Sequence, residues 1–178
     1  NPWWIPPFLF GRMPNVEDRL ISLLGFVAFA LLFENYDFSL LNAALKYIAA
    51  DLDIVESELS FFVAIIRLGA LPAFLIIPLA VPIGRRRLFM ISLGGMSIGT
   101  LCTAFSTSPI QFILFQVISR TFMLTASALA IVFITEEFPA ERRGWGIGML
   151  AAIGAVGQGL GALLFGLVDY LPYGWRFL

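Results

Sequence analysis

Four ionisable side chains interrupt stretches of sequence that are otherwise apolar: Glu34, Asp37, Arg67 and Arg120. An ionised group at the centre of a lipid bilayer costs several kcal/mol unless it is paired or hydrated. Two acids and two bases at similar depth can nearly neutralise one another. Glu34 and Asp37 are three residues apart, so they share one helix face. We therefore expect these groups to face the interior of a helix bundle.

The stretch around Arg120 also carries a stripe at helical spacing, which consists of Gln116, Arg120, Met123 and Ser127. Such a stripe must face protein or water, because exposure to lipid is expensive. A guanidinium presents a fork of donors that suits a carboxylate, and a carboxylate can carry a proton. Two compatible interpretations follow. The charges hold helices together, or they line a polar pathway that a breaking and reforming pair could gate.

Other site chemistries lack the residues they need. The chain contains no histidine, which removes the usual zinc ligands and His-based catalysis. Cys102 is the single cysteine, so no disulfide can form within the chain. We find no metal motif, nucleophile–base pair or cofactor loop. We therefore expect no enzyme, no cofactor and no metal, and the net charge of −1 gives no reason to expect a nucleic-acid partner.

The elements that must position these groups are membrane-spanning helices. Of the 178 residues, 60% are apolar and only 13% are charged, against about 25% charged in soluble domains. Five stretches reach the length of about 20 residues that a bilayer requires. The predicted fold is an all-α, polytopic transmembrane bundle, with helices near residues 20–45, 59–84, 88–107, 110–135 and 144–168. Residues 1–19 form an N-terminal segment before the bundle.

Lys and Arg predict the orientation. If the five helices alternate, seven arginines fall on one side: Arg12, Arg19, Arg85, Arg86, Arg87, Arg142 and Arg143. Lys46 and Arg176 fall on the other side, beside the acidic segment 51–58. This asymmetry places the N-terminus in the cytoplasm of a multi-pass protein of the cell membrane.

Small residues and prolines predict how the helices pack and bend. Three glycine pairs have the G-x-x-x-G spacing that lets two helix backbones approach in lipid: Gly95 with Gly99, Gly144 with Gly148, and Gly157 with Gly161. Three prolines in the second span, at positions 72, 78 and 82, predict bends there.

Several motifs, in this order and topology, resemble the major facilitator superfamily over nearly the whole chain after Arg19. Gly84-Arg85-Arg86-Arg87 is similar to the end of the family's cytoplasmic motif, and Arg120 stands where the family often has an intramembrane arginine. The segment 136–144, EEFPAERRG, resembles E-x-x-P-x-x-x-R-G of the sugar-porter and metabolite–proton symporter branches. Glu34-Asn35-Tyr36-Asp37 resembles their helix-one signature, and Gly174-Trp175-Arg176 also fits the family. The chain departs at Ile77, Val81 and Pro82, where the cytoplasmic motif has Gly, Asp and Arg.

This resemblance implies the N-terminal half of a twelve-helix secondary transporter, the C-terminal half lying beyond this chain. It implies proton-coupled symport of a small organic metabolite by alternating access. Arg67 and Arg120 favour an anion as that metabolite. The substrate and proton pathway would involve Glu34, Asp37, Arg67, Gln116 and Arg120, with Asp37 coupling protons and Arg120 binding the anion. Helices one, two, four and five would face the cavity, with helix three outside. The residues of the cytoplasmic gating loops would be Gly84, Arg85, Arg86, Arg87, Glu136, Glu137, Arg142 and Arg143.

One alternative stays open from the sequence. A membrane receptor, sensor or scaffold could use a transporter-like half without transporting anything. A second half downstream with matching hydropathy would favour transport, whereas a stop codon near Leu178 would favour the alternative.

Overall fold

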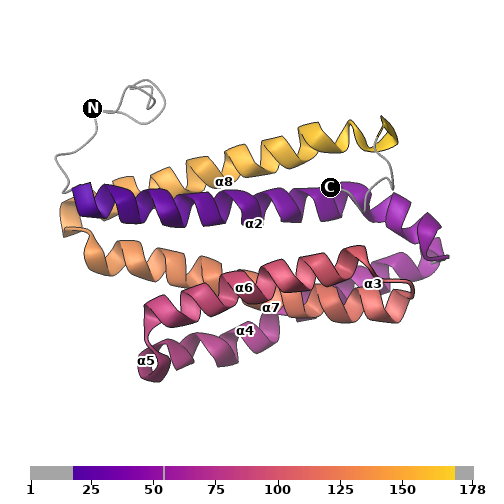
Figure 1. Ribbon diagram of the computed structural model, residues 1–178, viewed down its shortest axis with the longest axis horizontal. Coiled ribbons are helices and arrows are strands. Elements are labelled where there is room, and N and C mark those ends of the chain that lie inside the picture. The colour runs from indigo at the N-terminus through magenta and orange to yellow at the C-terminus, as the bar shows by residue number, and fades with distance from the viewer. Residues whose placement is uncertain (1–17, 54, 171–178) are drawn as a thin grey trace.

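The computed structural model describes residues 18–53 and 55–170 (Figure 1). The segment 1–17, with Arg12, and the motif Gly174-Trp175-Arg176 lie outside the described residues. The described chain is helical and has no β-strand, which confirms the predicted fold class. The helices are α2 (Asp18–Asp51), α3 (Glu56–Leu68), α4 (Ala70–Ile76), α5 (Ala80–Ile83), α6 (Arg85–Ala104), α7 (Pro109–Glu137) and α8 (Arg143–Phe165), with 3₁₀ turns at Ile77–Leu79, Ala140–Arg142 and Val168–Tyr170.

Five helical spans in the described part of the chain are long and apolar enough to cross a membrane, as predicted. The second of them is made of three short helices. It breaks at Gly69 and again around Pro78, so the predicted bend at Pro78 is present. Pro72 and Pro82 lie within α4 and α5. The buried Thr121 hydroxyl of α7 donates a hydrogen bond of 2.8 Å to the Gly69 carbonyl. A polar side chain thus satisfies a backbone group at the break, as the membrane interior demands.

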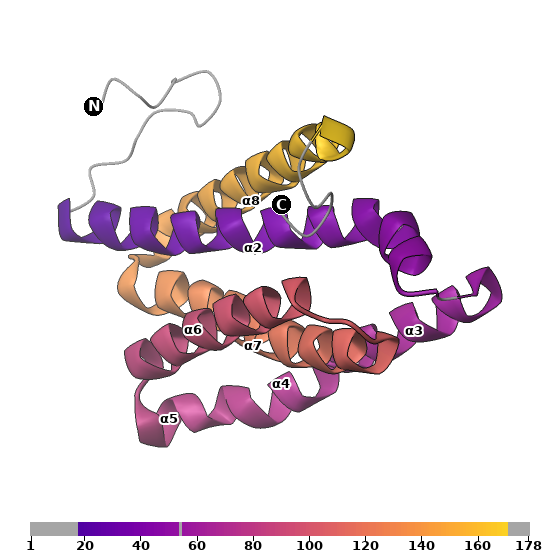
Figure 2. The same ribbon diagram turned by 45° about the vertical axis from the view of Figure 1, so that its right-hand side comes forward.

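The bundle consists of two packed groups of helices. Helix α2 packs mainly along α8, whereas α6, α3 and α4 pack against α7. In both ribbon views the α2–α8 pair lies on one side and α4, α6 and α7 on the other (Figures 1 and 2). The ends of α2 and α3 join the two groups at one end of the molecule, and α7 leads into α8 at the other.

Glycines make the closest helix contacts, as two of the three predicted pairs required. A Cβ on Gly157 would collide with the Leu32 carbonyl oxygen of α2, and one on Gly161 would lie 2.8 Å from the Tyr36 carbonyl oxygen. On the other side of the bundle, Gly99 of α6 leaves room for Ser119 of α7. The pair Gly144 and Gly148 differs, because neither position has a neighbour within 4 Å.

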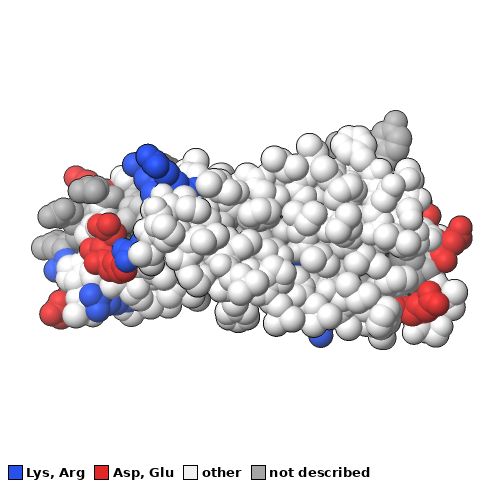
Figure 3. Space-filling model, turned by 90° about the horizontal axis from the view of Figure 1, so that it is seen from below, with Lys and Arg blue, Asp and Glu red and all other residues white. Residues whose placement is uncertain are grey.

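The surface has an apolar middle and charged ends. Large apolar side chains remain exposed along the helices, including Leu75 at 78% and Leu163 at 74%. Figure 3 shows charged side chains gathered at the two ends of the face in view, with a nearly uncharged band between them. This distribution suits a hydrocarbon layer around the middle and water at both ends.

Several helix ends differ from the sequence-based boundaries. The largest difference is at α2, which continues to Asp51 and not to the predicted residue 45. Only Gly84 separates α5 from α6, so the three predicted loop arginines form the first turn of α6. Gly84 has φ of +93°, a conformation that a residue with a side chain rarely adopts. Glu136 and Glu137 likewise belong to the last turn of α7.

Candidate functional site

Glu34 lies in the interior of the bundle, with 4% of its surface exposed. The Ser127 hydroxyl, from the polar stripe of α7, donates a hydrogen bond to Oε1 of Glu34. A buried carboxylate is retained only where polar partners replace its water. This contact joins α2 to α7 and places Glu34 between them.

Asp37 lies one turn further along α2 and faces a different neighbour. The Thr100 hydroxyl of α6 lies within hydrogen-bonding reach of its carboxylate. Both residues line a cavity of about 90 Å³ between α2, α6 and α7. Its other lining residues are Leu40, Leu41, Ala44, Ile48, Thr103, Ala104, Phe112 and Gln116. Asp37 is therefore held beside a small, partly open cavity that has a mixed polar and apolar lining.

Helix α6 contributes more to this cavity than the sequence predicted. Gln116 of α7 is buried, and its Nε2 lies 3.5 Å from the Thr103 hydroxyl of α6. Thr100 also contacts the Ser119 hydroxyl, with 3.1 Å between the oxygens. We expected this charge-free helix to sit outside the pathway, but its hydroxyls face Asp37. The spacing Ser97, Thr100, Thr103 was the available signal, since it places three hydroxyls along one side of a helix.

We expected Arg120 to lie within salt-bridge or one-water reach of Asp37 or Glu34. Among the described residues, no carboxylate oxygen lies within 4.0 Å of its guanidinium. The guanidinium instead lies over the Phe38 ring, with Cζ 4.5 Å from the centroid, and Nη1 lies 3.8 Å from Met123 Sδ. The first contact has the geometry of a cation–π interaction. Arg120 still acts electrostatically on both Glu34 and Asp37.

Arg67 joins Arg120 at a second, much smaller cavity between α2, α3 and α7. This cavity of about 10 Å³ is lined by both arginines and by Asn42, and it has the size of a single water molecule. The two positive charges repel one another across it. Two guanidiniums facing one space, with no carboxylate within ion-pairing distance of Arg120 in the described chain, leave positive charge that an anion could neutralise.

A larger cavity of about 350 Å³ lies on the other side of α2, between α2, α7 and α8. Its walls are mostly apolar, and its polar side chains are Asn35, Ser127 and Gln158. Asn35 uses one amide hydrogen within its own helix, where Nδ2 lies 2.8 Å from the Leu31 carbonyl oxygen. Volume and lining both fall in the range of small-molecule sites.

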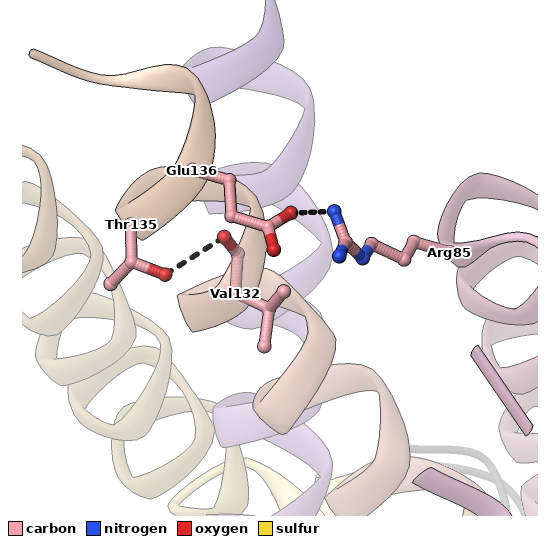
Figure 4. Close-up of polar contacts among 4 residues, drawn as sticks. All are labelled: Arg85, Val132, Thr135 and Glu136. Carbon is pink, nitrogen blue, oxygen red and sulfur yellow. Dashed lines mark hydrogen bonds and ion pairs between the residues drawn. The ribbon is translucent and has the colours of Figure 1, made fainter. Parts of the chain in front are cut away.

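The predicted gating residues lie at one end of the bundle, where α6 begins and α7 ends. Arg85 and Glu136 point toward one another from these two helices and form an ion pair (Figure 4). Arg143 Nε donates a 3.1 Å hydrogen bond to the carbonyl of the buried Phe138. Arg86, Arg87 and Glu137 are exposed, and Arg142 is half-buried. Of this set, the structure thus brings together Arg85 and Glu136, and it leaves the other side chains at the surface.

Comparisons with known proteins agree with this architecture. The model of the Major Facilitator Superfamily matches residues 27–178. Over 167 residues, 93% of this chain, the sequence is 28% identical to NiaP of Bacillus subtilis (strain 168), a protein named provisionally as a niacin/nicotinamide transporter. The match spans 41% of the length of that relative.

Proposed function

Because this chain belongs to the Major Facilitator Superfamily, we propose that it forms the N-terminal half of a secondary active transporter that couples protons to the symport of a small organic anion. The observation that carries this proposal is the group of ionisable residues inside the bundle. Glu34, Asp37 and Arg120 act on one another electrostatically and lie beside cavities at mid-span. Ionisable residues inside a membrane are expensive and usually mark ion or substrate pathways.

The substrate occupies the larger cavity in this proposal. Its volume of about 350 Å³ accommodates a small ring, and Asn35, Ser127 and Gln158 offer hydrogen bonds to it. Arg120 lies seven residues from Ser127 along the same stripe of α7, roughly 10 Å away, and attracts the negative charge. The name of the Bacillus subtilis relative makes a pyridine carboxylate such as nicotinate the first substrate to test.

Further elements of the proposal follow from the chain's place in the family. The C-terminal half of the same transporter completes the substrate site, since such sites lie near the midplane between two halves. The protein lies in the cell membrane with its N-terminus in the cytoplasm. The start of α6, the end of α7 and the start of α8 gate the cytoplasmic side.

A matched pair of variants tests the coupling assignment in the full-length transporter. Uptake of radiolabelled nicotinate is measured in proteoliposomes with an imposed pH gradient, and counterflow is measured without one. We expect Asp37→Asn to abolish accumulation while counterflow persists, because the proton carrier is lost but the substrate site remains. Glu34→Gln removes a charge from the same helix face and should retain pH-driven accumulation.

Two outcomes would contradict the proposal. Accumulation by Asp37→Asn in response to pH would show that this carboxylate is structural. Absence of nicotinate uptake and counterflow in the unmodified transporter would reject the proposed substrate class.

A further inference from the structure

The two carboxylates of α2 lie beside different cavities. Glu34 contacts Ser127, which lines the larger cavity toward α8, whereas Asp37 lines the smaller cavity toward α6. The helix thus presents Leu31 and Asn35 to one space and Asp37, Leu41 and Ala44 to the other. Described lining residues of the two cavities do not overlap.

The cavity between α2, α6 and α7 extends from Asp37 toward one end of the bundle. On α2 its lining continues to Ile48, roughly 16 Å beyond Asp37 at 1.5 Å per residue. On α6 and α7 it is lined by Ala104 and Phe112, which lie near the end of one helix and the start of the next. All three helices therefore carry the cavity toward the end of the molecule that bears Asp51 and Asp53. A volume of about 90 Å³ has room for several water molecules.

From this geometry we infer that Asp37 exchanges its proton through the cavity between α2, α6 and α7, separately from the substrate cavity, and that Thr100 positions its carboxylate there. The inference rests on the proposed proton-coupled symport. It assigns α6 a role in coupling, with Thr100 as a positioning residue that does not itself carry the proton. The Thr100 and Ser119 hydroxyl oxygens lie 3.1 Å apart. When Ser119 donates to Thr100, the Thr100 proton is left for the Asp37 carboxylate, which is then oriented from α6 and α7 together.

Thr100 is an uncharged partner of Asp37, unlike the ionisable groups around this carboxylate. The charged and titratable ones are Glu34 and Tyr36 on its own helix and Arg120 on α7, with Arg67 of α3 acting on Arg120. Helix α6 presents hydroxyls to Asp37, and among the described residues α8 presents no charged group to it. Replacing Thr100 therefore changes a hydrogen bond and leaves the charges around Asp37 as they were.

Cysteine accessibility tests the route without any substrate. In the full-length transporter with Cys102→Ala, we expect Ala44→Cys and Ala104→Cys to react with a charged, water-soluble thiol reagent. Leu101→Cys lies on the exposed apolar surface of α6 and should remain unreacted in the bilayer. The inference is overturned if neither Ala44→Cys nor Ala104→Cys reacts, because the cavity would then contain no water.

Thr100→Val and Thr100→Ser test the positioning role of Thr100 through uptake of radiolabelled nicotinate by proteoliposomes. We expect Thr100→Val to shift the pH profile of uptake by about one unit, the size of a lost hydrogen bond to a charged group. Counterflow should stay near its original rate, and Thr100→Ser should restore the profile. An unchanged profile in Thr100→Val, with Asp37→Asn still uncoupled, would reject this inference and leave the proposed function intact. If Asp37→Asn remains coupled, the proposed function itself fails.

Discussion

Arg120 carries its charge inside the bundle beside an aromatic ring, with Cζ 4.5 Å from the Phe38 centroid. A guanidinium placed this way keeps most of its five donors available for a ligand, with Nη1 beside Met123 Sδ. We predict that Arg120→Ala weakens binding of the transported anion by about 10-fold, because a positive charge roughly 10 Å from the anion is lost. Arg120→Lys should weaken it less, because the charge remains and the fork is lost.

Isothermal titration of the purified full-length transporter with the anion measures the effect. Lys46→Ala is a control, because Lys46 is an exposed cation of α2 that lines none of these cavities. Equal affinities of the Arg120→Ala variant and the unmodified protein would contradict the assigned role.

At this scale the sequence indicated which polar residues lie inside the bundle better than which residues touch. Glu34, Asp37, Arg120 and Gln116 stood out because each is polar inside an apolar span. Whether Arg120 pairs directly with Glu34 or Asp37, or reaches them through a water molecule, could not be predicted from spacing alone, since it depends on the rotamer and on Phe38. Thr100 was missed because a hydroxyl costs little in an apolar helix and gives a weak signal beside a charge.

Helix α8 packs against α2 through glycines, and this contact yields a prediction at the scale of whole elements. We expect Gly157→Ala to destabilise the protein by about 1–3 kcal/mol, because the new methyl group would collide with the Leu32 backbone and force the helices apart. Gly159→Ala is the control, since no atom lies within 4 Å of that position. Thermal unfolding of the two variants in the same detergent measures the difference. Equal melting temperatures would show that the helices part without cost.

Element types and breaks were predictable, and element partners were not. Length and hydropathy predicted the five spans, and the prolines predicted that the second span bends. The spacing of Gly144 and Gly148 matched that of Gly157 and Gly161, yet Gly144 and Gly148 face no neighbour. The glycine pattern indicates that another helix can pack closely at that position. Which helix packs there depends on how all the helices are arranged in the bundle. Helix ends shifted at residues 84–87 because one glycine suffices for the turn.

For the molecule as a whole, charge asymmetry predicts how the bundle lies in the membrane. We expect position 140 in the cytoplasm and position 55 outside. Both Val55 and Ala140 are exposed, so Val55→Cys and Ala140→Cys in a Cys102→Ala background should be accessible from their own sides. Intact cells treated with an impermeant thiol reagent should label Val55→Cys only. Labelling of Ala140→Cys in place of Val55→Cys would invert the topology.

The pairing of α2 with α8 also constrains how the protein is made. The main partner of the first described helix is the last long helix of the described chain, and about 90 residues separate Asp51 from Arg143. At roughly 5–20 residues per second, the ribosome needs several seconds to deliver that partner. During this interval Asn35 and the α2 backbone that contacts Gly157 and Gly161 lack their partner helix. Synthesis rate and the insertion machinery therefore become determinants of yield, and slowing translation between α2 and α8 should increase degradation of the nascent chain.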